Sequence, residues 1–193
     1  MAEKLRQLAG QGRVIVGICG GFQILGRTMH DPFGVESSIP SSAGLGLLDV
    51  ETSFARDKHT TQSSLPLGDG RGPLSGTRGL CLDGYEIHMG ETVSGPEALV
   101  LAEGADGPAG AVNREGNIFG SYLHGFFDNL NFTRRLLDNI RLAKGLPAMG
   151  HEAGEAETYQ QLKEKEYDRL ADEVEAALDF KKLAEIAGLK VSS

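Results

Sequence analysis

The stretch that decides the fold is RVIVGICGGFQILGRTM, residues 13–29. Its first part, Arg13 to Ile18, is a compact β-branched run, which is typical of a strand buried in a parallel sheet. After Cys19, the segment from Gly20 to Met29 places apolar residues on one helical face. Asp31 and the proline after it should end this helix, because a residue before proline is disfavoured in the α region. The order strand, cysteine, helix predicts a sharp turn that presents Cys19.

Cys19 has the surroundings of a catalytic nucleophile. A thiol attacks an amide carbonyl as the thiolate, and the free N–H groups and dipole of a helix N-terminus stabilise an anion. The neighbouring glycines permit a strained turn, and the N–H of Gly20 would be one oxyanion donor, as in the G-x-S-x-G elbow of hydrolases. The alternative is an ordinary core cysteine. Cys81 has no elbow glycine ahead of it and is interpreted as a small apolar residue.

A cysteine nucleophile needs a base, and the chain has five histidines. His124 ends an alternating strand pattern just before Gly125, so it should project from the strand's end, where open α/β sheets place their sites. The other histidines are less suited. His30 is expected to cap a helix, His59 to lie in a long loop, His88 to lie inside a strand and His151 to open a polar linker. His124 is therefore predicted to be the base.

The rest of the chain carries further strand signals and three helix signals. Periodicity predicts strands within residues 47–54, 85–89 and 98–102, a hairpin of residues 111–113 and 117–123, a loop over 57–79, and helices from residue 131 to Gly145, over 155–178 and over 180–188. This order predicts an α/β fold: a mostly parallel sheet with helices on both faces. A main domain over residues 1–150 would be followed by a helical extension over 151–193.

Composition excludes several classes of partner. The chain has 193 residues, with 19 basic and 27 acidic side chains and a formal charge of −8, which repels nucleic acids and anionic lipids. Two cysteines without CxxC spacing predict neither a disulfide framework nor a metal site. No apolar run is long enough for a membrane span or a signal peptide. A cytoplasmic protein without membrane or nucleic-acid partners is expected.

Several ordered motifs resemble one family. GICGGFQILG (Gly17 to Gly26) is similar to the nucleophile motif of class I glutamine amidotransferases, and SYLHG (Ser121 to Gly125) is similar to their histidine motif. Five motifs resemble, in this order along the chain, the C-terminal part of the cobyric acid synthases. They are DPFGVES, GLGLLDVETSF, GYEIHMGET, GSYLHGFFDN and YDRLADEVEAALD. The resemblance covers nearly the whole chain and implies the flavodoxin-like fold of the class I amidotransferases.

The resemblance implies a role for each matching residue. Cys19 would form a thioester with glutamine, and His124 would act as its base and then as its acid. Gly20 would donate to the oxyanion, and Gln23 would contact bound glutamine. Glu86 and His88 alternate on the GYEIHMG strand, so they could line the site together, or that strand could be merely structural.

One position departs from many class I amidotransferases. Those enzymes carry a glutamate two residues after the catalytic histidine, where this chain has Phe126. The departure favours a dyad of Cys19 and His124, with Asp128 or Glu86 as candidates to orient the imidazole ring.

The resemblance also implies substrates and missing parts. Glutamine would provide ammonia for ATP-driven amidation of a corrinoid, adenosylcobyrinic acid a,c-diamide, in cobalamin synthesis. No G-x-x-x-x-G-K-[ST] sequence occurs, so ATP and Mg²⁺ would belong to a synthetase domain outside this chain, and no cofactor or metal is expected within it. Few residues precede Cys19, so we expect a chain that lacks the first strand–helix units of its fold.

Two alternatives stand beside this reading. One is the glutaminase subunit of an enzyme that amidates cell-wall lipid precursors, whose elbow and histidine motifs are similar. The other is a catalytically silent fragment that keeps the same fold.

Overall fold

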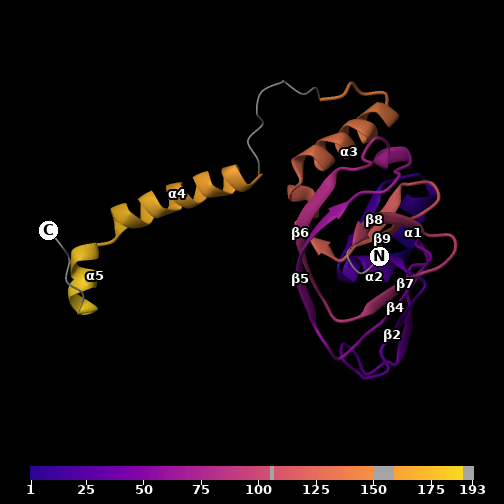
Figure 1. Cartoon of the computed structure of the whole chain (residues 1–193), viewed down its shortest axis with the longest axis horizontal. Coiled ribbons are helices and arrows are strands. Elements are labelled where there is room, and N and C mark those ends of the chain that lie inside the picture. The colour runs from indigo at the N-terminus through magenta and orange to yellow at the C-terminus, as the bar shows by residue number, and fades with distance from the viewer. Residues whose placement is uncertain (105–106, 150–158, 189–193) are drawn as a thin grey trace. The chain divides into compact units, whose positions relative to one another are not determined.

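The computed structural model describes residues 1–104, 107–149 and 159–188 (Figure 1). The chain divides into two compact units, Met1–Gly150 and His151–Ser193. The first unit carries three sheets, and the second carries the helices α4 (Tyr159–Ala177) and α5 (Phe180–Ile186). His151 and the polar linker predicted around it lie outside the described residues.

The elbow strand belongs to a four-stranded sheet. Strand β1 (Ile15–Ile18) pairs in parallel with β10 (Ile118–Ser121), which pairs antiparallel with β9 (Gly107–Val112), and β9 pairs antiparallel with β8 (Leu99–Gly104). The predicted hairpin of β9 and β10 is confirmed, and Gly116 in its turn has a φ of 79°. The register places Ile18 beside Ser121, at the carboxyl ends of both parallel strands.

Two further sheets complete the first unit. One has the order β3 (Ser41–Ala43), β2 (Thr28–His30), β4 (Val50–Ser53) and β7 (Glu91–Ser94). The other has the order β11 (Leu123–His124), β6 (Cys81–His88) and β5 (His59–Pro66). Because β11 follows β10 with only Tyr122 between them, the chain passes from the first sheet directly into this one.

Helices cover both faces of the sheet that contains β1. The described helices of the first unit are α1 (Ala2–Gly10), α2 (Gly20–Leu25), α3 (Leu130–Ala143) and the short 3-10 turns η1 (Gly72–Leu74) and η2 (Phe126–Asp128). Phe22 of α2 packs with Ile118 in one hydrophobic cluster, whereas Phe132 of α3 packs with Phe119 in another. Successive residues of β10 therefore face different cores, with α2 on one side and α3 on the other.

The α/β class is confirmed, but the prediction of a mostly parallel sheet is wrong for the described residues. There, β1 with β10 and β2 with β4 are the parallel pairs, and every other strand pair is antiparallel. Short connections explain the difference, because a hairpin turn can join only antiparallel neighbours. The elbow strand keeps its parallel partner.

Three local predictions are also wrong. The helix after Cys19 ends at Leu25 instead of Met29, so His30 ends strand β2 and does not cap a helix. The loop predicted over residues 57–79 contains strand β5, which begins at His59, and the turn η1. Cys81, interpreted as a small apolar residue, is exposed at the start of β6.

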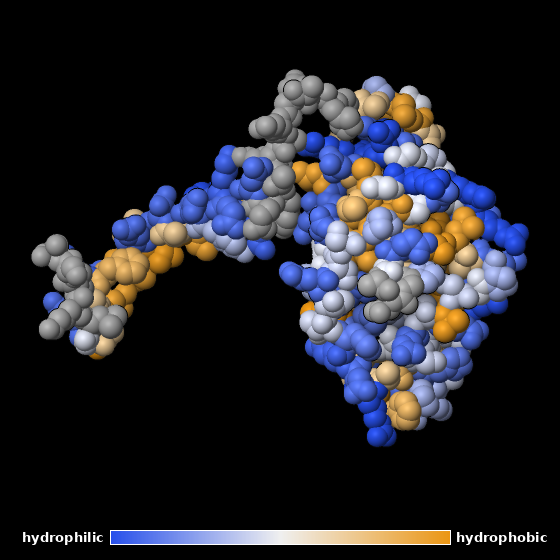
Figure 2. Space-filling model, in the orientation of Figure 1, coloured by the Kyte–Doolittle hydropathy of each residue, from blue (hydrophilic) through white to orange (hydrophobic). Residues whose placement is uncertain are grey.

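The second unit consists of helices with an exposed apolar stripe. Leu162, Leu170 and Val174 recur at helical spacing along α4, and all three are exposed. Figure 2 shows the stripe as an orange band that continues onto α5. Over the described part of the chain, every helix is too short or too polar to cross a membrane.

Candidate active site

The turn at Cys19 is a strained strand-to-helix elbow. Cys19 has a φ of 54° and a ψ of −117°, and among the described residues it is the one non-glycine with a positive φ. Its N–H donates to the carbonyl of Ser121 at 2.9 Å, which continues the pairing of β1 with β10, and α2 begins at the next residue. A side chain held in this conformation costs about 1–3 kcal/mol and persists only where the surrounding structure enforces it.

A glycine pair allows the elbow helix to lie close to the sheet. Gly17 of β1 is in register with Gly120 of β10. A Cβ on Gly17 would lie 2.6 Å from Leu25 Cδ1, and one on Gly120 would lie 2.8 Å from Phe22 Cδ2. Such contacts are too short for real atoms, so side chains at either position would push α2 away. The two glycines therefore fix the height of the elbow above the sheet.

The thiol of Cys19 reaches strand β6. It is half-buried, and its Sγ donates a hydrogen bond to the carbonyl of Ile87 at 3.5 Å. Strand β11 pairs with β6 only at Glu86 and Tyr85, so Ile87 lies just beyond the paired segment. Cys19 is therefore only partly buried. A nucleophile requires such a position, because a substrate must be able to reach the thiol.

His124 stands opposite Tyr85, a residue that the sequence analysis did not single out. The two residues are cross-strand neighbours in the β11–β6 pair, and their rings stack with centroids 5.0 Å apart and planes 7° apart. Within the described residues the imidazole has this ring contact and no hydrogen bond. Asp128, one of the two candidates to orient the ring, is exposed on η2 and does not bond to it.

The elbow and the histidine emerge at the same end of the parallel pair. Ile18 and Ser121 are neighbours, Cys19 follows the first, and His124 follows the second after two residues. Both side chains also meet β6, Cys19 at Ile87 and His124 at Tyr85. The described contacts do not include a direct hydrogen bond between thiol and imidazole, although both groups lie at this edge.

Gln23 is turned into the protein. It is 7% exposed, and its Nε2 donates to the hydroxyl of Tyr122 at 3.3 Å. That hydroxyl lies 2.6 Å from Thr92 Oγ1, which lies 2.7 Å from Thr52 Oγ1. The resulting chain of hydrogen bonds connects the elbow helix with β4 and β7. A contact of Gln23 with glutamine remains a prediction, and the bond to Tyr122 leaves its Oε1 acceptor and its second N–H donor available for one.

Glu86 and His88 lie on the same side of β6, as their alternation predicts. Their Oε2 and Nε2 atoms are 3.8 Å apart, and both side chains are largely buried. His88 Nδ1 lies 2.8 Å from the carbonyl of Gly90, which can only accept, so Nδ1 carries a proton. The ring also stacks on Tyr122 with centroids 3.8 Å apart.

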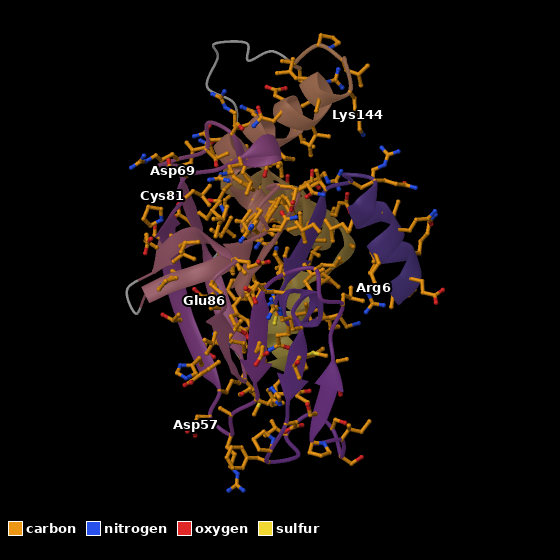
Figure 3. All side chains as sticks on the ribbon, turned by 90° about the vertical axis from the view of Figure 1, so that its right-hand side faces the viewer. Arg6, Asp57, Asp69, Cys81, Glu86 and Lys144 are labelled. Atoms are coloured by element: carbon orange, nitrogen blue, oxygen red, sulfur yellow. The ribbon has the colours of Figure 1, made fainter. Side chains whose placement is uncertain are left out.

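Glu86 does not orient His124. Its cross-strand partner is Leu123, so its side chain and that of His124 are on opposite faces of the β11–β6 pair. Figure 3 labels Glu86 well below Cys81, which lies near Asp69 at the other end of β6. The exposed second thiol therefore belongs to a different part of the strand.

Tyr85 and Tyr122 contact the candidate site residues, and sequence reasoning did not name them as part of the site. Both lie inside quoted motifs, and Tyr122 is two residues before His124, so strand alternation could have drawn attention to it. Thr52 and Thr92 come from another sheet, and no local pattern connects them with the elbow.

Asp31, which opens the DPFGVES motif, builds a loop outside this cluster. Its buried carboxylate accepts three backbone N–H groups, from Val35 at 2.8 Å, Glu36 at 2.9 Å and Ser37 at 2.8 Å. Burial opposes ionisation, but these N–H groups outweigh it and lower the pKa of the Asp31 carboxyl below its ordinary value. The motif is thus explained by loop structure.

A thiol on a strand-to-helix elbow, with a histidine on the chain that follows the neighbouring strand, is the arrangement of α/β enzymes that cleave acyl bonds by covalent catalysis. A solved structure titled "Structure of PurLQS from Thermotoga maritima" shares the fold, with a TM-score of 0.53 and 19% identity over 74% of this chain and 68% of that one.

The chain belongs to the CobB/CobQ-like glutamine amidotransferase domain family, whose profile matches residues 1–132. It is 42% identical over 189 residues to a cobyric acid synthase of Dehalococcoides mccartyi, which covers 95% of this chain and 36% of that protein. It is also 42% identical over 193 residues to a cobyric acid synthase of Citrobacter koseri, with the same coverage. The resemblance seen in the sequence is confirmed, and the chain spans 36% of the length of these relatives.

Proposed function

We propose that this chain is a glutaminase that releases ammonia from glutamine through a thioester on Cys19. The observation that carries the proposal is the elbow itself: a cysteine held at a φ of 54° with its half-buried thiol at the edge where His124 emerges. Strain of this kind at a reactive side chain is retained where chemistry needs it. Membership of an amidotransferase family supports glutamine as the substrate.

The reaction has two stages. In the first, His124 takes the thiol proton, the Cys19 sulfur attacks the side-chain carbonyl carbon of glutamine, and His124 returns the proton to the leaving nitrogen as ammonia departs. In the second, His124 activates water, which attacks the thioester to give glutamate and restores the thiol. The N–H of Gly20, at the first position of α2, would donate to the oxyanion in both stages.

The present contacts show what must change when glutamine binds. The thiol donates to the Ile87 carbonyl, so it must exchange that acceptor for the imidazole. Catalytic hydrogen bonds are often long or absent before substrate binds. Glu86 and His88 flank Ile87 on β6, and in this proposal they support the strand at that point instead of reacting.

The acceptor of the ammonia would be a corrinoid carboxylate. The relatives are named cobyric acid synthase, and the motif resemblance implies amidation of adenosylcobyrinic acid a,c-diamide in cobalamin biosynthesis. ATP and Mg²⁺ would activate that carboxylate in a synthetase part, which corresponds to the length of the relatives that this chain does not match. Ammonia would pass from the Cys19 site to that part.

Labelling with the glutamine analogue diazo-oxo-norleucine tests the glutaminase. We expect Cys19 to be alkylated, glutamine to protect it, and Cys19→Ala to abolish both labelling and glutamate release. Cys81→Ser is the matched control, because this exposed thiol lies elsewhere on β6, and it should leave both unchanged. Labelling of Cys19 no faster than of Cys81 would identify a catalytically silent fold.

His124 has its own test. His124→Gln should slow alkylation of Cys19 and glutamate release together, whereas an unchanged alkylation rate would remove His124 from the mechanism. In an enzyme that contains the synthetase part, Cys19→Ala should abolish corrinoid amidation from glutamine but spare amidation from ammonium salts. Loss of the reaction with ammonium salts would contradict the proposal that the Cys19 site only supplies ammonia to the synthetase part.

A further inference from the structure

We propose that Tyr85 is the positioning residue of the dyad: its ring holds the His124 imidazole in the orientation that proton transfer requires, in the place of a carboxylate. This inference rests on the proposed glutaminase function. It assigns to an exposed aromatic side chain the orienting role that an acidic residue has in a nucleophile–base–acid triad.

The first argument is the geometry of the pair. A centroid separation of 5.0 Å with nearly parallel planes is an offset stack, the arrangement that aromatic rings favour. Tyr85 and His124 are directly opposite each other on antiparallel strands, where side chains are closest. The stack restricts rotation of the imidazole about its last side-chain bond, which a histidine without hydrogen bonds would otherwise leave free.

The second argument is that neither acidic candidate bonds to the imidazole in the described structure, although Asp128 Oδ2 lies beside Gly125, the residue after His124. Glu86 points to the other face of the strand pair and lies 3.8 Å from His88. Asp128 is exposed and makes no bond to the ring in the described structure. Tyr85 is therefore the side chain that the described structure offers to orient His124.

The third argument is that the two backbones are clamped together at this point. A Cβ on Gly84 would lie 2.1 Å from the His124 carbonyl oxygen, so the chains approach more closely than any other residue allows. Asn129 bonds to both backbone groups of Asp83, accepting its N–H at 2.8 Å and donating to its carbonyl at 2.9 Å. Asn129 also donates to the Gly125 carbonyl at 3.1 Å. The strand that carries Tyr85 is thus fixed against β11 and the turn that follows His124.

The fourth argument is that Tyr85 contributes little to the core. Its side chain is 47% exposed, and its hydroxyl has no hydrogen bond within the described residues. Tyr122, by comparison, is 8% exposed and packs in a hydrophobic cluster. The exposed ring is placed where it contacts the base.

Kinetics of three variants test the proposal in the Cys81→Ser chain. Loss of a stack worth about 0.5–1.5 kcal/mol reduces the oriented population of His124 about two- to tenfold. Tyr85→Leu should therefore lower kcat for glutamate release by that factor with little change in KM, whereas Tyr85→Phe should stay close to the parent. Gln62→Ala, on the strand position paired with Tyr85, is the matched surface control and should not differ from the parent.

A measurement that does not need turnover separates this inference from the proposed function. The NMR signals of the His124 ring protons can be assigned by comparison with His124→Gln. Their chemical shifts should include the ring-current effect of Tyr85, which Tyr85→Phe should preserve and Tyr85→Leu should remove. Equal kcat in the Leu variant and the parent, or equal losses in Leu and Phe, would overturn the proposal, as would an unchanged His124 shift in Tyr85→Leu. A parent chain that resists diazo-oxo-norleucine but keeps the ring-current shift would overturn the glutaminase and leave the orienting contact established.

Discussion

Replacing Cys19 by glycine should make the protein more stable than replacing it by alanine, although both changes remove the nucleophile. Alanine keeps a Cβ at a φ of 54° and a ψ of −117°, whereas glycine adopts positive φ freely. Strain of this kind is worth about 1–3 kcal/mol. Glycine also gives up about 0.5–1 kcal/mol through the greater freedom of the unfolded chain. Taking the middle of each range, the net advantage of Cys19→Gly over Cys19→Ala is about 1 kcal/mol.

Both variants lose the Sγ hydrogen bond to Ile87, so this loss cancels in the comparison. Urea unfolding followed by circular dichroism measures the difference as a shift in midpoint at constant slope. Cys81 provides a matched control, because it lies in a strand and its φ is not positive. There glycine should be less stable than alanine by about 0.5–1 kcal/mol, the opposite sign. A Cys19→Gly variant no more stable than Cys19→Ala would refute the claim that the elbow stores strain.

Two further changes test the packing around the site, and a third tests the loop that Asp31 builds. Gly120→Ala should lower the free energy of unfolding by about 1–3 kcal/mol, measured in urea, because its Cβ would meet the Gly17 carbonyl oxygen at 2.6 Å. Thr92→Val should lower the free energy of unfolding by about 1–3 kcal/mol in the same assay, because the buried hydroxyl of Thr52 would lose its partner. An unchanged midpoint would show that this hydrogen bond does not stabilise the fold. The stability that ionisation of Asp31 contributes should be complete above the ordinary aspartate pKa and lost as the pH falls through its lowered folded value, so the difference between the wild type and Asp31→Ala should shrink in acid.

The elbow could be predicted because its signals are local. A β-branched run, a cysteine between glycines and an apolar helical face lie within one short stretch, and the chain forms β1, the Cys19 turn and α2 there. The β9–β10 hairpin and helix α3 were predicted for the same reason, and the buried Phe132 and Leu136 lie on the expected face of α3.

The end of α2 could not be predicted, because distant residues determine it. The carbonyls of Ile24 and Leu25 accept N–H groups from Leu45, Leu47 and Leu48. Gly26 is extended at this point, with a ψ of −176°, and packs against Val50. The apolar pattern in the sequence extends to Met29, but the helix ends at Leu25. There, hydrogen bonds to distant residues take the place of bonds within the helix.

Strand β5 was predicted to be a loop because its side chains carry almost no burial signal. Most of HTTQSSLP is polar and exposed, and the segment is held by pairing with β6 from His59 to Pro66. The same limit applies to the site. Its strand ends were visible in the sequence, but the stacking of Tyr85 on His124 depends on the register between β6 and β11, which no local pattern encodes.

The parallel pairing of β1 with β10 has a consequence for biosynthesis. These strands come from the beginning and the later part of the first unit, so a ribosome releases Cys19 long before the segment that must lie beside it. Until that second segment arrives, the nascent chain has a thiol but no base and no framework to hold the turn. If the proposed glutaminase function holds, reactivity towards glutamine would therefore require this long-range pairing to be complete.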